Sequence, residues 1–263
     1  MLISIHIPKT AGTAWRLHVE ANAGARAGFV SVESRDRHDP ATRAHALIRA
    51  GDDAGARAIL DQAGCTLVHG HQAPDFLDLL PDAPAMLWLR DPYARLRSEF
   101  LHLRRKRRNE TAEQGRVHDG EIDFADYVRP RRDLYARLLG RLDKHPGDYA
   151  VFLTERSEAA ARAFHEALGW RGRIPARNVT PVDDPDAPPS APDGDIAALL
   201  AGDTGIHRNW LTAWDNGDAA DAARRLLSAS GAGYEPAAPA LRLRRRIGVW
   251  KEGVGRLFGR DWR

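Results

Sequence analysis

The residues best suited to chemistry lie near the start of the chain, where an apolar segment leads into a lysine and small residues. Positions 3 to 15 read Ile-Ser-Ile-His-Ile-Pro-Lys-Thr-Ala-Gly-Thr-Ala-Trp. A strand, a short turn and a helix in that order bring the first N–H groups of the helix to the turn, where small residues let an anion approach. Lys9 adds positive charge. The pattern predicts an oxyanion-binding loop, although it lacks the Gly-Lys-Ser/Thr ending of a nucleoside triphosphatase loop.

A second candidate group follows an apolar segment in the first half of the chain. Arg90 comes directly after residues 85–89, and Ser98 stands eight positions later in a helix-compatible segment. A guanidinium offers a charged fork and a hydroxyl a neutral donor, so the two side chains can hold one phosphate together. Taken alone this pattern is weak, because an arginine after a strand is common.

A third group is the His69-Gly70-His71 segment, which ends another apolar run. A histidine with a pKa near neutrality suits the removal of a proton from a hydroxyl or an amine. We expect at most one of the two histidines to face the cleft directly. A zinc site is the alternative chemistry, but no cysteine or carboxylate spacing supports one.

The most basic run is Arg104 to Arg108. Three interpretations remain open for it: binding of nucleic acid, attraction of an acidic substrate, or a solvated helix end that complements the helix dipole. No aromatic residues interleave with it and no DNA-reading motif accompanies it, so we expect no nucleic-acid partner.

These residues need elements to position them, and the hydrophobic pattern supplies an alternation of strands and helices. The predicted strands cover residues 2–7, 65–69, 85–89 and 149–153. The predicted helices cover residues 13–21, 41–63 (as one or two helices), 92–108, 122–140 and 157–168. Such alternation predicts an α/β protein with a parallel sheet covered on both faces. Ligands of these sheets bind beyond the carboxyl ends of the strands, so we expect Lys9, His71 and Arg90 to converge there.

Composition and length set the organisation of the chain. The 263 residues are 43% hydrophobic and 29% charged, an ordinary globular balance, with a net charge of only +3. We divide the chain into an α/β core at residues 1–180, a Pro/Asp-rich loop at 181–193 and a helical C-terminal extension at 194–263 that packs on the core. The single cysteine, Cys65, predicts a reducing compartment and a buried structural thiol. Without a leader pattern or a long apolar run, the expectation is a soluble cytoplasmic protein without a membrane span.

Together the three groups resemble the sulfotransferase superfamily, in particular the branch of carbohydrate 2-O- and 6-O-sulfotransferases and their bacterial relatives. Residues 6–15 resemble that family's 5′-phosphosulfate loop, and residues 89–100 resemble its 3′-phosphate motif. His69-Gly70-His71 lies between them, as the Gly-His element carrying the base does in that branch. Weaker similarity continues at residues 122–127, 135–140, 154–155, 168–170 and 177–180. The loop departs from the family at Ala11, where glycine is frequent.

The resemblance implies 3′-phosphoadenosine 5′-phosphosulfate (PAPS) as donor and no metal. It implies a P-loop kinase-like three-layer fold, with a central parallel sheet flanked by helices and a helical C-terminal segment. His71 would be the catalytic base, with His69 as the alternative, and Lys9 would stabilise charge on the bridging oxygen. The 5′ end of the donor would be held by Lys9, Thr10, Ala11, Gly12, Thr13 and Ala14, and its 3′-phosphate by Arg90 and Ser98.

The acceptor implied by this resemblance is a hydroxyl, on a carbohydrate by analogy, with lipid and small-molecule hydroxyls close behind. Two other functions stay open at this point. One is a P-loop-like kinase or phosphotransferase, which the missing Gly-Lys-Ser/Thr disfavours. The other is a non-catalytic sulfotransferase-like protein that docks an anionic partner through its basic helix.

Overall fold

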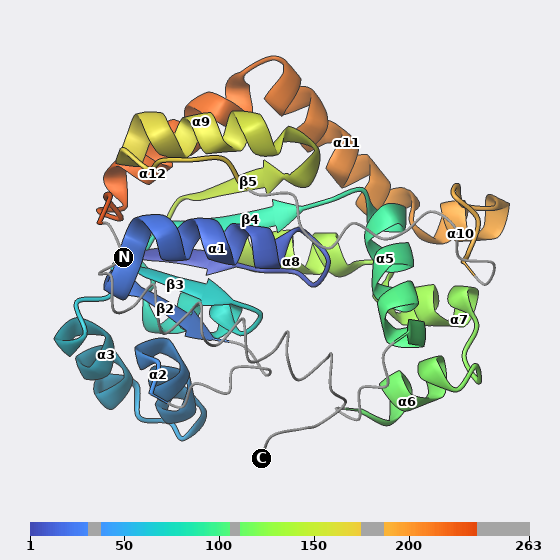
Figure 1. Cartoon of the computed structure of the whole chain (residues 1–263), viewed down its shortest axis with the longest axis horizontal. Coiled ribbons are helices and arrows are strands. Elements are labelled where there is room, and N and C mark those ends of the chain that lie inside the picture. The colour runs from blue at the N-terminus through green and yellow to red at the C-terminus, as the bar shows by residue number, and fades with distance from the viewer. Residues whose placement is uncertain (31–37, 106–110, 175–186, 236–263) are drawn as a thin grey trace, which may run out of the picture.

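A sheet of five parallel strands forms the centre of the molecule in a computed structural model, which describes residues 1–30, 38–105, 111–174 and 187–235 (Figure 1). The strands lie in the order β2-β3-β1-β4-β5, and every adjacent pair is parallel. In Figure 1, α1 crosses the front of the sheet and α8 lies behind it. The predicted α/β fold with a central parallel sheet flanked by helices is therefore confirmed.

The strands are short and almost wholly buried, as expected when helices cover both faces. They are β1 (Leu2–Ile5), β2 (Ala27–Val30), β3 (Leu67–Gly70), β4 (Ala85–Leu89) and β5 (Tyr149–Leu153). The sequence pattern predicted four of them and missed β2. That edge strand has only four residues, Ala-Gly-Phe-Val, and no polar alternation or turn residues mark it. Gly28 allows a close approach there, because a Cβ on it would lie 2.8 Å from the Cβ of Ala41.

The helices alternate with these strands. They are α1 (Gly12–Ala23), α2 (Pro40–Arg49), α3 (Asp53–Gln62), α4 (Phe76–Leu79), α5 (Pro92–Arg105), α6 (Ala112–His118), α7 (Phe124–Val128), α8 (Leu134–Leu142), α9 (Ser157–Leu168), α10 (Gly194–Leu199), α11 (Ala201–Asp215) and α12 (Asp218–Ala229). Short 3₁₀ turns are η1 (Gly24–Arg26), η2 (Ala73–Asp75), η3 (Arg129–Arg131) and η4 (Thr154–Arg156). The residues predicted as helical at 41–63 form two helices.

The start of α5 shows how local sequence sets an element that carries a candidate site residue. Pro92 occupies the first turn, where a missing N–H costs no hydrogen bond. Asp91 caps the helix, since its Oδ1 accepts from the N–H of Ala94 at 2.8 Å. Arg90 is therefore held at the junction between β4 and a helix with a well-defined first residue.

The core on the α1 face of the sheet is aromatic. Trp15 of α1 packs against Trp88 of β4 and Phe164 of α9, with ring centroids 5.1 and 4.6 Å apart. Trp170 stacks on Phe164 at 5.2 Å, and all four side chains are buried. Large rigid rings of this kind fix the position of α1, and with it the turn that precedes the helix.

Residues 187–235 pack on the sheet and its helices. Helix α12 packs against α9 and β5, and the indole Nε1 of Trp214 in α11 donates to the carbonyl of Val151 in β5 at 2.9 Å. The described part of the Pro/Asp-rich loop contacts α5, where Tyr93 Oη donates to the carbonyl of Pro189 at 2.6 Å. Residues 175–186, which span the end of the predicted core and the start of the predicted loop, and residues 236–263 of the predicted extension lie outside the described residues.

The strand order makes β1 the point where the connections change direction. The chain leaving β1 runs to β2 on one side, whereas the chains leaving its neighbours β3 and β4 run toward the other side. Crevices that bind ligands in open α/β sheets open beyond the carboxyl end of such a strand. Lys9 follows β1, His71 follows β3 and Arg90 follows β4, so all three candidate residues emerge at this switch point.

Candidate functional site

The loop after β1 has the backbone of an anion-binding turn. Lys9 and Ala11 are the non-glycine residues with positive φ among those described, at 70° and 61°. These conformations turn the chain sharply into α1, which has no side-chain cap and no acidic residue in its first turn. Within the helix, the N–H of Trp15 donates to the carbonyl of Ala11 at 2.9 Å. The positive end of the helix dipole therefore lies at this turn, where it favours an anion.

Thr10 does not direct its hydroxyl and N–H groups toward an anion at the turn, as the resemblance implied. Its hydroxyl donates to the carbonyl of Ile7 at 2.8 Å, and its N–H points at the same oxygen at 3.3 Å. The side chain is fully buried. Thr10 therefore braces the turn from inside, and the exposed Thr13 is the loop hydroxyl that stands at the surface.

His6 is a part of the site to which the sequence analysis gave no role. Its ring stacks on that of His71, with centroids 4.3 Å apart, and lies 5.5 Å from that of His69. It occupies the space that Gly12 leaves open, since a Cβ on Gly12 would lie 1.6 Å from His6 Cε1. Burial, and then the neighbouring His71 and His69, hold the pKa of His6 well below its usual range. A neutral ring at this position links the loop to both other histidines.

A main-chain carbonyl determines which ring nitrogen of His71 carries the proton when the ring is neutral. Its Nδ1 lies 2.9 Å from the carbonyl oxygen of His6, and a carbonyl only accepts, so Nδ1 carries the proton and donates. In the neutral ring this leaves Nε2 with a lone pair. The side chain is half-buried, so the ring is partly open to solvent. This is the arrangement that a general base requires.

His69 has a different environment, although it is only two residues away. The ring is 2% exposed, and its Nδ1 lies 2.9 Å from the hydroxyl of Ser4, which also accepts from the indole Nε1 of Trp15 at 3.1 Å. Burial, with a smaller contribution from His71, lowers the pKa of His69 to about 3. His69 is thus a neutral, interior side chain, whereas His71 is partly exposed.

Arg90 joins the end of β4 to the loop after β1. Its Nη1 donates to the carbonyl of Lys9 at 3.3 Å, which brings a guanidinium to the turn that precedes α1. Ser98 lies two turns into α5 and is buried. The structure therefore joins Arg90 directly to the Lys9 loop, and it joins His71 to the same segment through His6.

The main chain of Arg90 makes further contacts that the sequence gave no reason to expect. The hydroxyl of Tyr135 in α8 donates to the carbonyl of Arg90 at 2.6 Å, and the next N–H, that of Asp91, donates to Glu155 Oε1 at 2.8 Å. Both partners stand 45 or more positions away in the chain. The resemblance covered both residues without giving either a role.

Other sequence candidates contribute less. Helix α5 ends at Arg105, and residues 106–108 of the basic run lie outside the described residues. Cys65 is buried just before β3, and burial, with smaller contributions from Asp39 and Asp61, raises the pKa of its thiol to about 11. Within the described ranges, no group of three or more His, Cys, Asp or Glu side chains is arranged to hold a metal ion.

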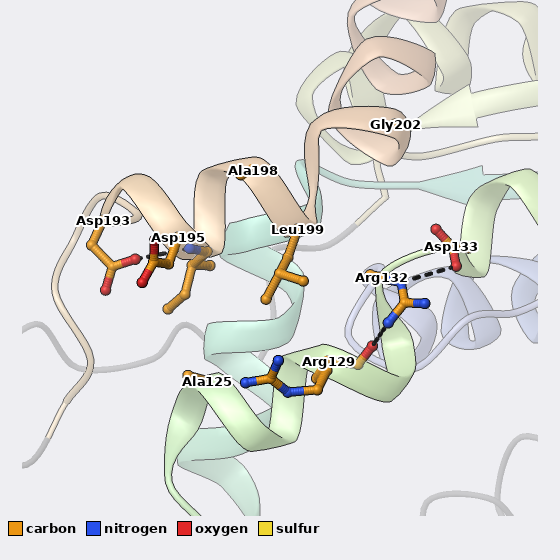
Figure 2. A pocket seen from close by; sticks show the side chains of 10 residues that line it. Ala125, Arg129, Arg132, Asp133, Asp193, Asp195, Ala198, Leu199 and Gly202 are labelled. Carbon is orange, nitrogen blue, oxygen red and sulfur yellow. Dashed lines mark hydrogen bonds and ion pairs between the residues drawn. The ribbon is translucent and has the colours of Figure 1, made fainter.

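A separate open groove of about 670 Å³ lies beside α10 and α7, away from the loop after β1 (Figure 2). Charged and small residues line it: Ala125, Arg129, Arg132, Asp133, Asp193, Asp195, Ile196, Ala198, Leu199 and Gly202. Figure 2 shows Leu199 pointing from α10 toward Arg129, with the two aspartates at the start of α10. None of the predicted site residues lines this groove.

Comparison with protein-family models, with curated proteins and with solved structures found no match for this chain. Among the residues described, no helix is both long enough and apolar enough to cross a membrane. A function for this chain is therefore inferred from the geometry of the site.

Proposed function

We propose that this chain is a sulfotransferase, which transfers a sulfuryl group from PAPS to an acceptor hydroxyl. The observation that carries the proposal is the meeting of three strand ends at one edge of the sheet. Arg90 Nη1 contacts the carbonyl of Lys9, and His71 Nδ1 contacts the carbonyl of His6. A helix N-terminus, a guanidinium and an oriented imidazole thus stand together, which suits a donor with two phosphates and a reaction that needs a base.

The residues present fit such a donor. The uncapped start of α1 supplies N–H groups for the 5′ end, and Lys9 and Thr13 flank them. Arg90 and Ser98 are the residues that we assign to the 3′-phosphate, by their positions after β4 and within α5. When bound, PAPS supplies an activated sulfuryl group, which leaves the 5′-phosphate as the acceptor oxygen bonds to sulfur.

In this mechanism His71 takes the proton of the acceptor hydroxyl on Nε2. In the neutral ring, the hydrogen bond from Nδ1 to the His6 carbonyl leaves the lone pair on Nε2, and it fixes the plane of the ring. The Lys9 ammonium stabilises the negative charge that develops on the 5′-phosphate oxygen, as fixed charges do in other transfer reactions. His69 holds the strand end through Ser4 and takes no proton, because its environment keeps it neutral.

The donor assignment is tested by thermal denaturation of the purified protein with adenosine 3′,5′-bisphosphate, with ADP and with no nucleotide. A ligand that binds only the folded state raises the melting temperature. We expect the larger rise with adenosine 3′,5′-bisphosphate. A larger rise with ADP would favour a kinase. No rise with either would favour a protein that uses the fold only to bind a partner.

The acceptor is tested separately, with PAPS labelled in the sulfuryl group and a panel of hydroxyl compounds. Carbohydrates are the first class, followed by lipid and small-molecule alcohols. Transfer of label to one class identifies the acceptor. Binding of adenosine 3′,5′-bisphosphate without transfer to any class would support the donor site and leave the base assignment to be tested with further acceptors.

A further inference from the structure

Both polar atoms of one peptide unit, between Arg90 and Asp91, are bound by side chains from other elements. The Arg90 carbonyl accepts from Tyr135 Oη at 2.6 Å, and the Asp91 N–H donates to Glu155 Oε1 at 2.8 Å. The Arg90 N–H also points at Tyr135 Oη, at 3.4 Å. A turn between a strand and a helix can satisfy such groups with water. Here it is held from α8 on one side and from the end of β5 on the other.

Tyr135 is itself held firmly. Its side chain is fully buried, and burial raises the pKa of its hydroxyl, so it remains a donor. The N–H groups of Tyr135 and Ala136 donate to the two carboxylate oxygens of Asp203 at 3.0 and 3.2 Å. Asp203 lies in α11 and is buried, so a residue far along the chain caps the start of α8. The hydroxyl at Arg90 is therefore fixed through α8 to α11.

Glu155 supplies a charge to the other end of the peptide. Burial would raise the pKa of Glu155, but the nearby His207 and the hydrogen bond from the Asp91 N–H outweigh this and lower it to about 2. His207 Nε2 lies 3.4 Å from Glu155 Oε2, within ion-pair range but longer than a well-formed hydrogen bond. The carboxylate is thus ionised at neutral pH and accepts the Asp91 N–H as a charge-assisted hydrogen bond.

We infer that Tyr135 and Glu155 are positioning residues, which fix the Arg90–Asp91 peptide so that the Arg90 guanidinium is set to bind the 3′-phosphate of the donor. The inference rests on the proposed function, because it assigns that phosphate to Arg90. An arginine side chain has many rotamers, and ordering it on binding weakens affinity. When both polar atoms of the Arg90–Asp91 peptide are fixed, the guanidinium has fewer positions to lose on binding, so less affinity is lost. A nucleotide with a 3′-phosphate gains from this, and a nucleotide without one does not.

The test is Tyr135→Phe, which removes one hydroxyl and keeps the ring. Calorimetric titration measures the affinity of wild type and variant for adenosine 3′,5′-bisphosphate and for adenosine 5′-monophosphate. We expect the affinity for adenosine 3′,5′-bisphosphate to fall about fivefold to tenfold, which is the effect of one lost hydrogen bond. The affinity for adenosine 5′-monophosphate should not change. The ratio of the two affinities is the decisive readout, because a loss of general stability would weaken both nucleotides alike.

The matched control is Tyr127→Phe. Tyr127 is also buried beside α5, and its hydroxyl has no hydrogen-bond partner within the described part of the chain. We expect this variant to keep the wild-type ratio. Glu155→Ala and Glu155→Gln form a second pair, which keeps the inference testable if Tyr135→Phe fails to fold. Alanine removes the acceptor of the Asp91 N–H and should lower the ratio, and glutamine keeps an acceptor oxygen and should restore most of it.

The outcomes separate the two claims. If wild type binds both nucleotides equally, the proposed function fails, and the inference fails with it. If wild type prefers the bisphosphate and Tyr135→Phe keeps the full preference, the inference alone is overturned. A reduced preference in Tyr135→Phe and Glu155→Ala, with an unchanged one in Tyr127→Phe, supports both.

Discussion

The edge of the sheet beyond β1, β3 and β4 and the groove beside α10 differ in how their polar groups are held. At the sheet edge, His71 and Arg90 both bind carbonyl groups of the loop after β1, which lies more than 60 residues away in the chain. In the groove, Arg132 contacts its neighbour Asp133 at 3.4 Å and the carbonyl of Arg129 at 3.3 Å. The first set of contacts depends on the fold, whereas the second can form within one short segment.

Exposure follows the same division. Thr10 and His69 at the sheet edge are buried, whereas the side chains of Arg129 and Arg132 keep 61% and 49% of their exposure. Exposed ion pairs are screened by solvent and contribute little to stability. The side chains of the groove are therefore less tightly held than those of the sheet edge, and we expect substitutions in the two regions to differ in their effects.

The largest effect is expected from His71→Ala. Loss of a general base lowers turnover by about 10²–10⁴-fold, and the affinity for adenosine 3′,5′-bisphosphate should change little, because His71 is assigned to the acceptor. Turnover is measured with labelled PAPS and the acceptor that the panel identifies, and affinity by titration. His118→Ala, at the half-exposed end of α6, is the control. Normal turnover in His71→Ala would show that His71 is not the catalytic base.

Gly12→Ala tests whether the histidine stack and the loop form one packed unit. The new Cβ would lie 1.6 Å from His6 Cε1 and 1.8 Å from His6 Nε2, so the ring must leave its place. We expect the free energy of unfolding to fall by about 1–3 kcal/mol, as in overpacked cores, and bisphosphate binding to weaken. Denaturant titration measures the first effect.

The control for that substitution is Gly205→Ala in α11, where nothing lies within 4 Å of the new Cβ. A mid-helix glycine replaced by alanine stabilises by about 0.4–1 kcal/mol. The two glycines should thus respond with opposite signs. Equal responses would mean that the space beside Gly12 is not shaped around His6.

Much of the sheet edge could be predicted from sequence, because the carboxyl ends of parallel strands share one edge. The bounds of β4, β5 and α9 agree with the predicted segments, and Arg90 follows β4 as expected. The contacts that distinguish the residues could not be predicted. His69 and His71 are the same residue type two positions apart, and only the packing of Ser4 and Trp15 shows which one is interior.

Tyr135 and Glu155 illustrate the same limit. Each meets the Arg90–Asp91 peptide because α8 lies behind the sheet and β5 lies beside β4, and neither neighbour relation is written in local sequence. The edge strand β2 was missed for a local reason, because two of its residues, Ala27 and Gly28, are small and do not mark a strand. Local pattern thus predicts which residues reach the edge, and tertiary packing decides what each does there.

A smaller effect at the sheet edge is expected from Glu155, through the pH dependence of the melting temperature. The pKa of Glu155 is about 2 in the folded protein and 4.5 as its ordinary value, so the folded state binds fewer protons. Its contribution to stability is therefore present above pH 4.5 and is lost as pH falls toward 2. We expect Glu155→Gln to melt below wild type at pH 7 and the difference to narrow on acidification. Glu121→Gln, at an exposed ion pair with Arg116, should show almost no difference at either pH.

The smallest effect is expected from Arg132→Ala in the groove. The side chain is about half-exposed and its partners are adjacent in sequence, so the free energy of unfolding should change by no more than about 0.5 kcal/mol. Affinity for adenosine 3′,5′-bisphosphate should also stay at the wild-type value, because the proposed function assigns this nucleotide to Arg90 and the start of α1. Titration and denaturant unfolding check both. A tenfold loss of nucleotide affinity would show that the groove is part of the donor site, and the division between a prebuilt edge and a solvated groove would then be wrong.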